Sequence, residues 1–206
     1  MINYFIHIIK VYKFYIFKIL FYEFFFTLLG YKGNKIVIKN NKYRTDNIPT
    51  PYYFLHKISV FLKKKRIKSL IDLGCGSGRT IFFLNKKNKI KYYGVEYEYD
   101  NYLYCKSLFI NNRNILIKKT DFLKMNYTKT NFDCFFLNDP LKKNKDFKNI
   151  VKKITFISNK KKKKIYFIFV NINKRKLLSI KNLFKIKAFS INSRGFYIFT
   201  NYDSYK

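Results

Sequence analysis

The sequence predicts an α/β fold in which a doubly wound, mostly parallel sheet of seven strands ends in an antiparallel hairpin. Five short apolar runs of strand length alternate with segments whose apolar residues have helical spacing. Such alternation produces right-handed βαβ units, whose helices cover both faces of a parallel sheet. Two further apolar runs near the C-terminus are separated by too few residues for a helical crossover, so they predict the hairpin.

Length and composition indicate a globular chain. The 206 residues are 48% hydrophobic and 21% aromatic, which excludes a disordered polycation in spite of the formal net charge of +33. Only six of the 44 basic residues are arginine, alanine occurs once and tryptophan is absent, a composition typical of a genome very rich in A and T. Because that bias alone supplies much of the lysine, charge does not decide between nucleic acid and other partners.

The cysteine and histidine residues exclude two classes of site. Cys75, Cys105 and Cys134 show no CxxC spacing, and neither His7 nor His56 lies near them in the sequence. A zinc site and a disulfide framework are therefore excluded, and no metal is expected. Unpaired cysteines are typical of a reducing compartment, so we expect a cytoplasmic protein.

Residues 1–42 are predicted to be an N-terminal amphipathic helix and a turn-rich connector, followed by a single domain at 43–206. Within 1–30, five polar residues fall on one arc of a helix: Asn3, His7, Lys10, Lys13 and Lys18. Lysines and Glu23 divide the apolar stretch into pieces too short to span a bilayer. Two placements of this helix stay open, one packed on the domain and one in peripheral contact with a membrane surface.

The remaining elements follow in order. A helix is expected at 52–65, and further helices at 80–86, 101–111 and 147–157. Strands are expected at 67–73, 90–96, 114–121, 132–138 and 165–171, with the hairpin at 184–190 and 196–201.

Glycines and acidic residues, which are scarce in this sequence, are concentrated between residues 72 and 139. Four of the seven glycines lie between residues 74 and 94, and seven of the eleven acids lie between 72 and 139. The sequence from Leu70 to Thr80, LIDLGCGSGRT, runs from an apolar strand through a glycine-rich turn into a helix. Glycines allow a ligand to approach the backbone N–H groups at the start of that helix.

This segment resembles motif I of the class I S-adenosylmethionine-dependent methyltransferases, written D-x-G-x-G-x-G. The match comprises Asp72, Gly74, Gly76 and Gly78. The resemblance covers about residues 43–201 and implies a Rossmann-like fold, an enzyme of the methyltransferase class and S-adenosyl-L-methionine as the cofactor.

Two later strand ends continue the resemblance. In the family, an acid at the end of the second strand accepts hydrogen bonds from both ribose hydroxyls, and Glu96 stands there; Glu98 lies past the strand and is expected to face solvent. An aspartate at the end of the third strand accepts from the adenine amine beside an apolar side chain, which matches Asp121 and Phe122. A structural role for Asp121 in a turn or helix cap stays open.

The methyl acceptor is expected beyond the fourth strand. Members that methylate nitrogen carry (N/D/S)-P-P-(Y/F) there, and Asp139-Pro140 matches the first two positions, although the second proline is absent and Leu141 replaces the aromatic residue. Asp139 and Pro140 are thus the catalytic candidates, with Tyr52 and Tyr127 as other polar groups near the substrate. The Pro-Thr-Pro-Tyr stretch at 49–52 is similar to one in small bacterial relatives of protein-lysine methyltransferases, where it closes over the donor pocket.

Three functions remain open from sequence alone. The first is methyl transfer to nitrogen on a protein, the second is methylation of RNA, which the net charge favours. The third is a catalytically inactive binding protein with a methyltransferase fold.

Overall fold

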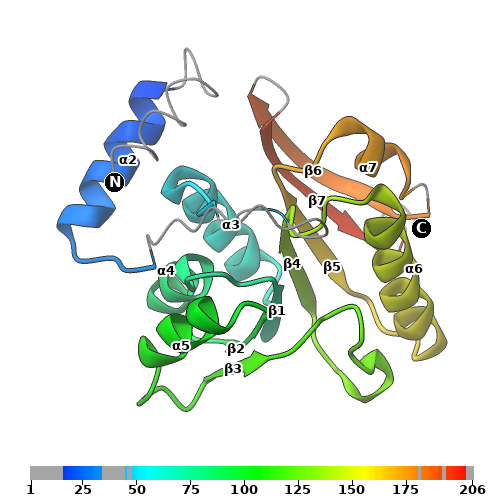
Figure 1. The fold of residues 1–206 in the computed structure, drawn as a ribbon. Coiled ribbons are helices and arrows are strands. Elements are labelled where there is room, and N and C mark those ends of the chain that lie inside the picture. The colour runs from blue at the N-terminus through cyan, green and yellow to red at the C-terminus, as the bar shows by residue number, and fades with distance from the viewer. Residues whose placement is uncertain (1–15, 34–44, 46–47, 181, 192–193, 203–206) are drawn as a thin grey trace.

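The computed structural model describes residues 16–33, 45, 48–180, 182–191 and 194–202, and it confirms the predicted α/β fold (Figure 1). Seven strands form one sheet in the order β3-β2-β1-β4-β5-β7-β6. Strands β1 to β5 are parallel, whereas β7 pairs antiparallel with both β5 and β6. The strands are β1 Ser69–Leu73, β2 Lys91–Glu96, β3 Ile115–Lys119, β4 Cys134–Asn138, β5 Tyr166–Val170, β6 Phe184–Ile191 and β7 Arg194–Thr200.

Helices cover both faces of the sheet (Figure 1). On one face lie α2 Ile16–Leu28, α3 Tyr52–Lys64, α4 Arg79–Lys87 and α5 Tyr99–Ser107; on the other lie α6 Asn144–Lys160 and α7 Lys174–Leu178. The short helix α7 and the 3-10 turn η2 Tyr127–Lys129 were not predicted, because each is too short to show a periodic pattern.

The two core clusters follow from strand geometry. Successive side chains of a strand point to opposite faces, so Leu70 packs with the cluster under α3 and α4, while Ile71 and Leu73 pack with the cluster under α6. All five residues of β5 are buried, as expected for a strand covered on both faces. The carboxyl ends of the parallel strands therefore share one edge of a rigid sheet.

Helix α2 packs on α3 in an orientation that leaves an aromatic face outward. Its buried residues are Ile19, Glu23 and Phe26, whereas Phe17 and Phe21 are exposed. The inward position of Glu23 was not predicted, and its cause is an ion pair described below. Four of the five residues on the predicted polar arc lie outside the described residues; Lys18 lies within α2. Across the described ranges, no helix combines the length and apolarity needed to cross a bilayer.

Candidate active site

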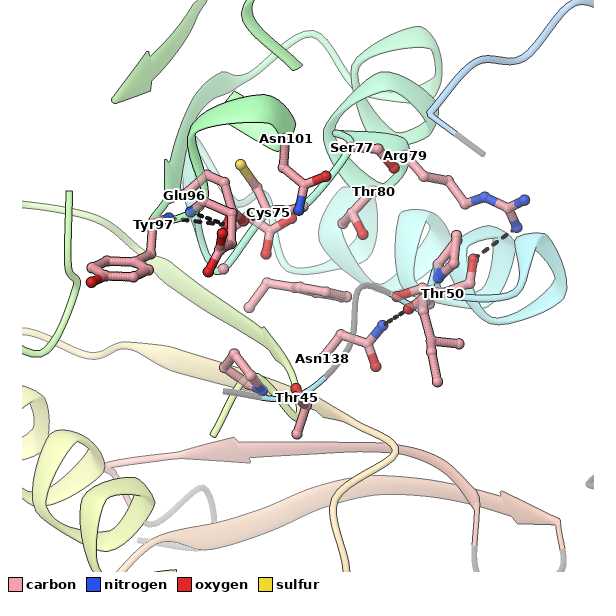
Figure 2. Close-up of a pocket in the computed structure, with 18 of the residues that line it drawn as sticks. Thr45, Thr50, Cys75, Ser77, Arg79, Thr80, Glu96, Tyr97, Asn101 and Asn138 are labelled. Atoms are coloured by element: carbon pink, nitrogen blue, oxygen red, sulfur yellow. Dashed lines mark hydrogen bonds between the residues drawn. The ribbon is translucent and has the colours of Figure 1, made fainter. Parts of the chain in front are cut away.

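A hollow opens at the carboxyl edge of the sheet, beside the ends of β1, β2 and β4 (Figure 2). It holds about 860 Å³ free of protein atoms, part of it open to solvent. Ligands in open α/β sheets bind at this edge. The lining residues are Thr45, Ile48, Pro49, Thr50, Asp72, Gly74, Cys75, Gly76, Ser77, Arg79, Thr80, Glu96, Tyr97, Glu98, Asn101, Phe122, Phe136, Asn138 and Pro140.

The glycine-rich turn after β1 forms one wall of the hollow. Gly74 and Gly76 both line it, with φ values of 88° and 53° that favour glycine. A Cβ on Gly74 would lie 2.9 Å from the Cβ of Pro140, so this glycine also lets the loop after β4 approach. Gly78 does not line the hollow; it precedes α4, and a Cβ there would lie 2.7 Å from the sulfur of Cys105.

Glu96 ends β2 and is fixed by three backbone donors. One carboxylate oxygen accepts from Gly76 N at 2.7 Å, and the other accepts from Tyr97 N at 3.0 Å and Glu98 N at 2.9 Å. Burial raises the pKa of Glu96, and these three hydrogen bonds oppose that rise. Glu98 lines the hollow and is half-buried, so the expectation that it faces solvent was wrong.

Asp72 lies near the end of β1 and is 1% exposed. Its Oδ1 has no hydrogen-bond partner among the described residues, and the same holds for Oδ1 of Asn101 and Oγ1 of Thr50, which line the same hollow. Burial, and secondarily the nearby Glu96 carboxylate, raises the pKa of Asp72 well above its ordinary range. Three buried oxygens without a hydrogen-bond partner thus belong to residues that line one hollow, an arrangement that favours a polar ligand.

Of the two candidate residues in the loop after β3, only one lines the hollow. Phe122 lines the hollow and is buried, but Asp121 does not line it. The Asp121 carboxylate accepts from Leu123 N at 2.9 Å, which is the local turn contact that the sequence left open.

The end of β4 and the loop after it close the other side of the hollow through Asn138 and Pro140. The Asn138 amide donates to Ile48 O at 2.8 Å and accepts from Asn171 Nδ2 at 3.0 Å. Figure 2 shows Asn138 turned toward the segment that precedes α3. The loop is therefore joined to residues about ninety positions earlier in the chain.

Asp139 lies in the same loop but outside the lining of the hollow. Its carboxylate pairs with Lys176 of α7, whose ammonium also donates to the Leu141 carbonyl; Lys176 is 1% exposed. Thr45 Oγ1 donates to the Asp139 carbonyl, and Asp139 has a positive φ of 40°. The side chain is held by an ion pair, while Pro140 beside it meets the hollow.

Neither tyrosine suggested near the substrate lines the hollow. The Tyr52 hydroxyl donates to Tyr31 O at 3.3 Å, and the Tyr127 hydroxyl donates to Phe122 O at 2.8 Å. Both side chains are buried, because each hydroxyl finds a carbonyl inside the core. The expectation that they approach the substrate was wrong.

Comparison with protein families identifies the chain. A family model described as a methyltransferase domain matches residues 64–192, which is more than half of the sequence. The chain belongs to the methyltransferase domain family. A search of curated proteins found no matching sequence.

Solved structures show the same fold as this methyltransferase. A human methyltransferase 10 domain containing protein is 18% identical with a TM-score of 0.59, over 86% of this chain and 93% of that one. An RNA methyltransferase from Salinibacter ruber, in complex with S-adenosyl-L-homocysteine, is 11% identical with a TM-score of 0.57, over 76% and 95%. The N-methyltransferase NodS from Bradyrhizobium japonicum WM9 is 10% identical with a TM-score of 0.55, over 72% and 94%.

The methyltransferase is of class I, for which S-adenosylmethionine is the methyl donor. The hollow fits this molecule in chemistry: unsatisfied oxygens of Asp72, Asn101 and Thr50 can accept from its ammonium and hydroxyl groups. Gly74 and Gly76 of the glycine-rich turn line the same hollow. Within the described ranges, no three His, Cys, Asp or Glu side chains are grouped so as to hold a metal ion.

Several lining residues of the methyltransferase were missed by sequence reasoning. Tyr97, Asn101 and Asn138 line the hollow, and Lys176 holds the loop beside it. Asn101 could have been found as the polar residue one turn into the helix after Glu96. Lys176 had no signal, because one lysine among many carries no pattern.

Proposed function

We propose that this methyltransferase transfers the methyl group of S-adenosylmethionine to a nitrogen atom on a protein side chain. One observation carries the proposal: the glycine turn and Glu96 share a single hollow with Asn138 at the end of β4 and Pro140 in the loop after it. The family resemblance favours this proposal, in which the donor binds at the glycine turn and Glu96 and the acceptor amine approaches Asn138 and Pro140. Within this proposal the relation to protein-lysine methyltransferases rests on the segment at 49–52, whose Pro49 and Thr50 line the hollow.

Each donor-binding residue has a proposed task. Glu96 accepts from the ribose hydroxyls and Asp72 faces the cationic part of the donor, while Gly74 and Gly76 keep the turn open. Phe122 packs on the adenine, and Asp121 is proposed as the acceptor of the adenine amine. Gly78 acts through the turn, since it does not line the hollow.

The chemical step needs positioning more than covalent assistance. When bound, S-adenosylmethionine would supply a methyl group on a sulfonium, which is a good leaving group, so the site would need mainly to hold a neutral amine in line with that methyl carbon. Asp139 and Pro140 are proposed to shape the loop that aims the amine, with the Asp139 carboxylate held by Lys176. The amine must lose a proton before attack, and the hollow is open to solvent, which can receive it.

Radiolabel transfer tests the acceptor class. Methyl-labelled S-adenosylmethionine and the purified protein are added to lysate of the source organism, which is then separated into protein, RNA and lipid. We expect acid-stable label in protein, with Gly76→Arg as the matched control lacking transfer. Label in RNA would replace this proposal with the RNA alternative, and donor binding without transfer to any fraction would favour an inactive binding protein.

We also propose that the enzyme works in the cytoplasm, in peripheral contact with an anionic membrane through α2. The three cysteines are free thiols, as a reducing compartment would maintain. Phe17, Phe21 and Phe24 of α2 are more than half exposed and lie on one helical stripe. The formal net charge of +33 favours contact with an anionic surface.

Vesicle sedimentation tests the membrane contact. We expect the protein to sediment with vesicles that contain anionic phospholipid and to stay in solution with neutral phosphatidylcholine. Phe17→Ser with Phe21→Ser should remove this binding, whereas Phe156→Ser, at an exposed position of α6, should leave it unchanged. Equal sedimentation of the two variants would contradict the proposed surface.

A further inference from the structure

We propose that Glu23 and Arg79 are positioning residues for the cofactor turn, so that the placement of α2 sets the affinity for S-adenosylmethionine. This inference rests on the proposed function, because it assumes that the turn at residues 74–78 binds the donor. Glu23 lies on α2, and Arg79 directly follows the last glycine of the turn as the first residue of α4.

The two side chains form a buried ion pair. Arg79 Nη1 lies 2.7 Å from Glu23 Oε2, and the side chains are 3% and 2% exposed. The other oxygen, Glu23 Oε1, accepts from Tyr52 N at 2.7 Å, at the first residue of α3. One carboxylate thus connects the starts of α3 and α4.

Arg79 continues this connection to the rim of the hollow. Its Nη1 also donates to Thr50 O at 3.3 Å, and its guanidinium lies 4.1 Å from the centroid of the Tyr52 ring. Arg79 and Thr50 both line the hollow (Figure 2). A displacement of α2 would therefore move the segment at 49–52 and the start of α4 together.

A second connection reaches the turn from the residues after α2. Ser77 Oγ donates to Gly33 O at 2.6 Å. A Cβ on Gly33, whose φ is +92°, would lie 2.4 Å from Arg79 N, so only glycine permits this approach. The chain from Glu23 to Gly33 thus touches the cofactor turn at Ser77 and at Arg79.

The choice of an ion pair indicates a role beyond stability. Burying two charges is costly, and apolar residues of similar volume often stabilise such positions equally well. An ion pair with arginine also constrains orientation, because the planar guanidinium can hold its partners through several donors at once. We infer that the pair is retained because it fixes the geometry of the turn.

The experiment compares single variants with an apolar double variant of the full chain. Binding of S-adenosylhomocysteine, the demethylated product, is measured by calorimetry, and melting temperature is measured on the same preparations. Glu23→Gln should lower the melting temperature, because it leaves Arg79 buried without its counter-charge, and should weaken binding at least tenfold. The double variant Glu23→Leu with Arg79→Met should regain the melting temperature and still bind at least tenfold more weakly.

The matched control is Lys163→Met. It removes the ion pair of Lys163 with Asp133, 3.0 Å long, at the opposite edge of the sheet before β4. This control should leave binding unchanged.

The possible results separate three conclusions. A double variant with both wild-type melting temperature and wild-type affinity would overturn the inference, as would loss of folding in every Glu23 and Arg79 variant, which would make the pair purely structural. Absence of binding by the wild-type protein would instead overturn the proposed function on which the inference rests.

Discussion

Asp72 is a residue whose position in the fold costs stability. Its buried carboxyl has a raised pKa, so the folded chain binds a proton more tightly there than the unfolded chain does. The stabilisation of the folded state by this tighter proton binding is fully present below 3.8, the ordinary pKa of the carboxyl. It is lost as the pH rises toward the higher pKa that the carboxyl has in the folded chain. A cationic ligand beside the carboxylate would reverse that cost.

Asp72→Asn should therefore raise the melting temperature and weaken donor binding. We expect the melting temperature to rise by about 2–4 °C for each kcal/mol of destabilisation that the substitution removes at neutral pH. The affinity for S-adenosylmethionine should fall tenfold or more. The gain over wild type should shrink as the pH falls toward and below 3.8, because the carboxyl then becomes protonated in the unfolded state as well. Calorimetric melting across this pH range would contradict the argument if the gain were constant.

Glu96 should matter more for the donor than its neighbour Glu98, although both line the hollow. The Glu96 carboxylate is already aimed by three backbone N–H groups. Glu96→Ala should cost about 1–3 kcal/mol of donor binding, the range for a charged hydrogen-bond partner. Glu98→Ala is the matched control, and a larger loss in that variant would show that the ribose lies nearer to Glu98.

Asp139 needs a variant pair, because its removal leaves Lys176 buried without a counter-charge. Asp139→Ala should destabilise the fold, while Asp139→Ala with Lys176→Met should recover much of the loss. If Asp139 orients the acceptor loop, both variants should keep donor affinity within a few-fold and lose roughly a hundredfold in turnover. Normal turnover in the stabilised double variant would remove Asp139 from the proposed site.

At the scale of elements, the turn between β1 and α4 has to stay free of side chains. Gly76→Arg should abolish donor binding, because the added side chain would fill the hollow that Gly76 lines. Gly30→Arg is the matched control: Gly30 also has a positive φ, of 71°, but nothing lies within 4 Å of a Cβ there. A folded Gly76→Arg protein with unchanged affinity in calorimetry would remove the turn from the site.

The elements themselves could be predicted because their signals are local. The apolar runs that became β1 to β5 and the hairpin are visible in the sequence, and so is the glycine turn. The contacts that complete the hollow could not be predicted, since Glu23 meets Arg79 and Asn138 meets Ile48 across 56 and 90 residues. In the sequence, Glu23 is visible only as a charge that interrupts an apolar stretch, and nothing near it identifies Arg79 as its partner. The division of the chain at residue 43 stays a prediction.

At the scale of the whole molecule, the salt dependence of RNA binding can show whether the net charge of +33 serves RNA recognition. If RNA is the acceptor, log affinity should fall linearly with log salt, with a slope near −0.7 for each phosphate neutralised on a single strand. For a protein acceptor we expect weak RNA binding that has no effect on turnover. Methyl transfer measured over a salt series with RNA as competitor distinguishes the two.

The order of the sheet has a consequence for how the chain is made. Strand β7, residues 194–200, is synthesised after β6, yet it lies between β5 and β6. Until it leaves the ribosome, β5 presents an unpaired apolar edge, a feature that favours aggregation during synthesis. A stop codon a few residues before 194 would thus remove an interior strand, and its product should be insoluble although every residue of the hollow is present.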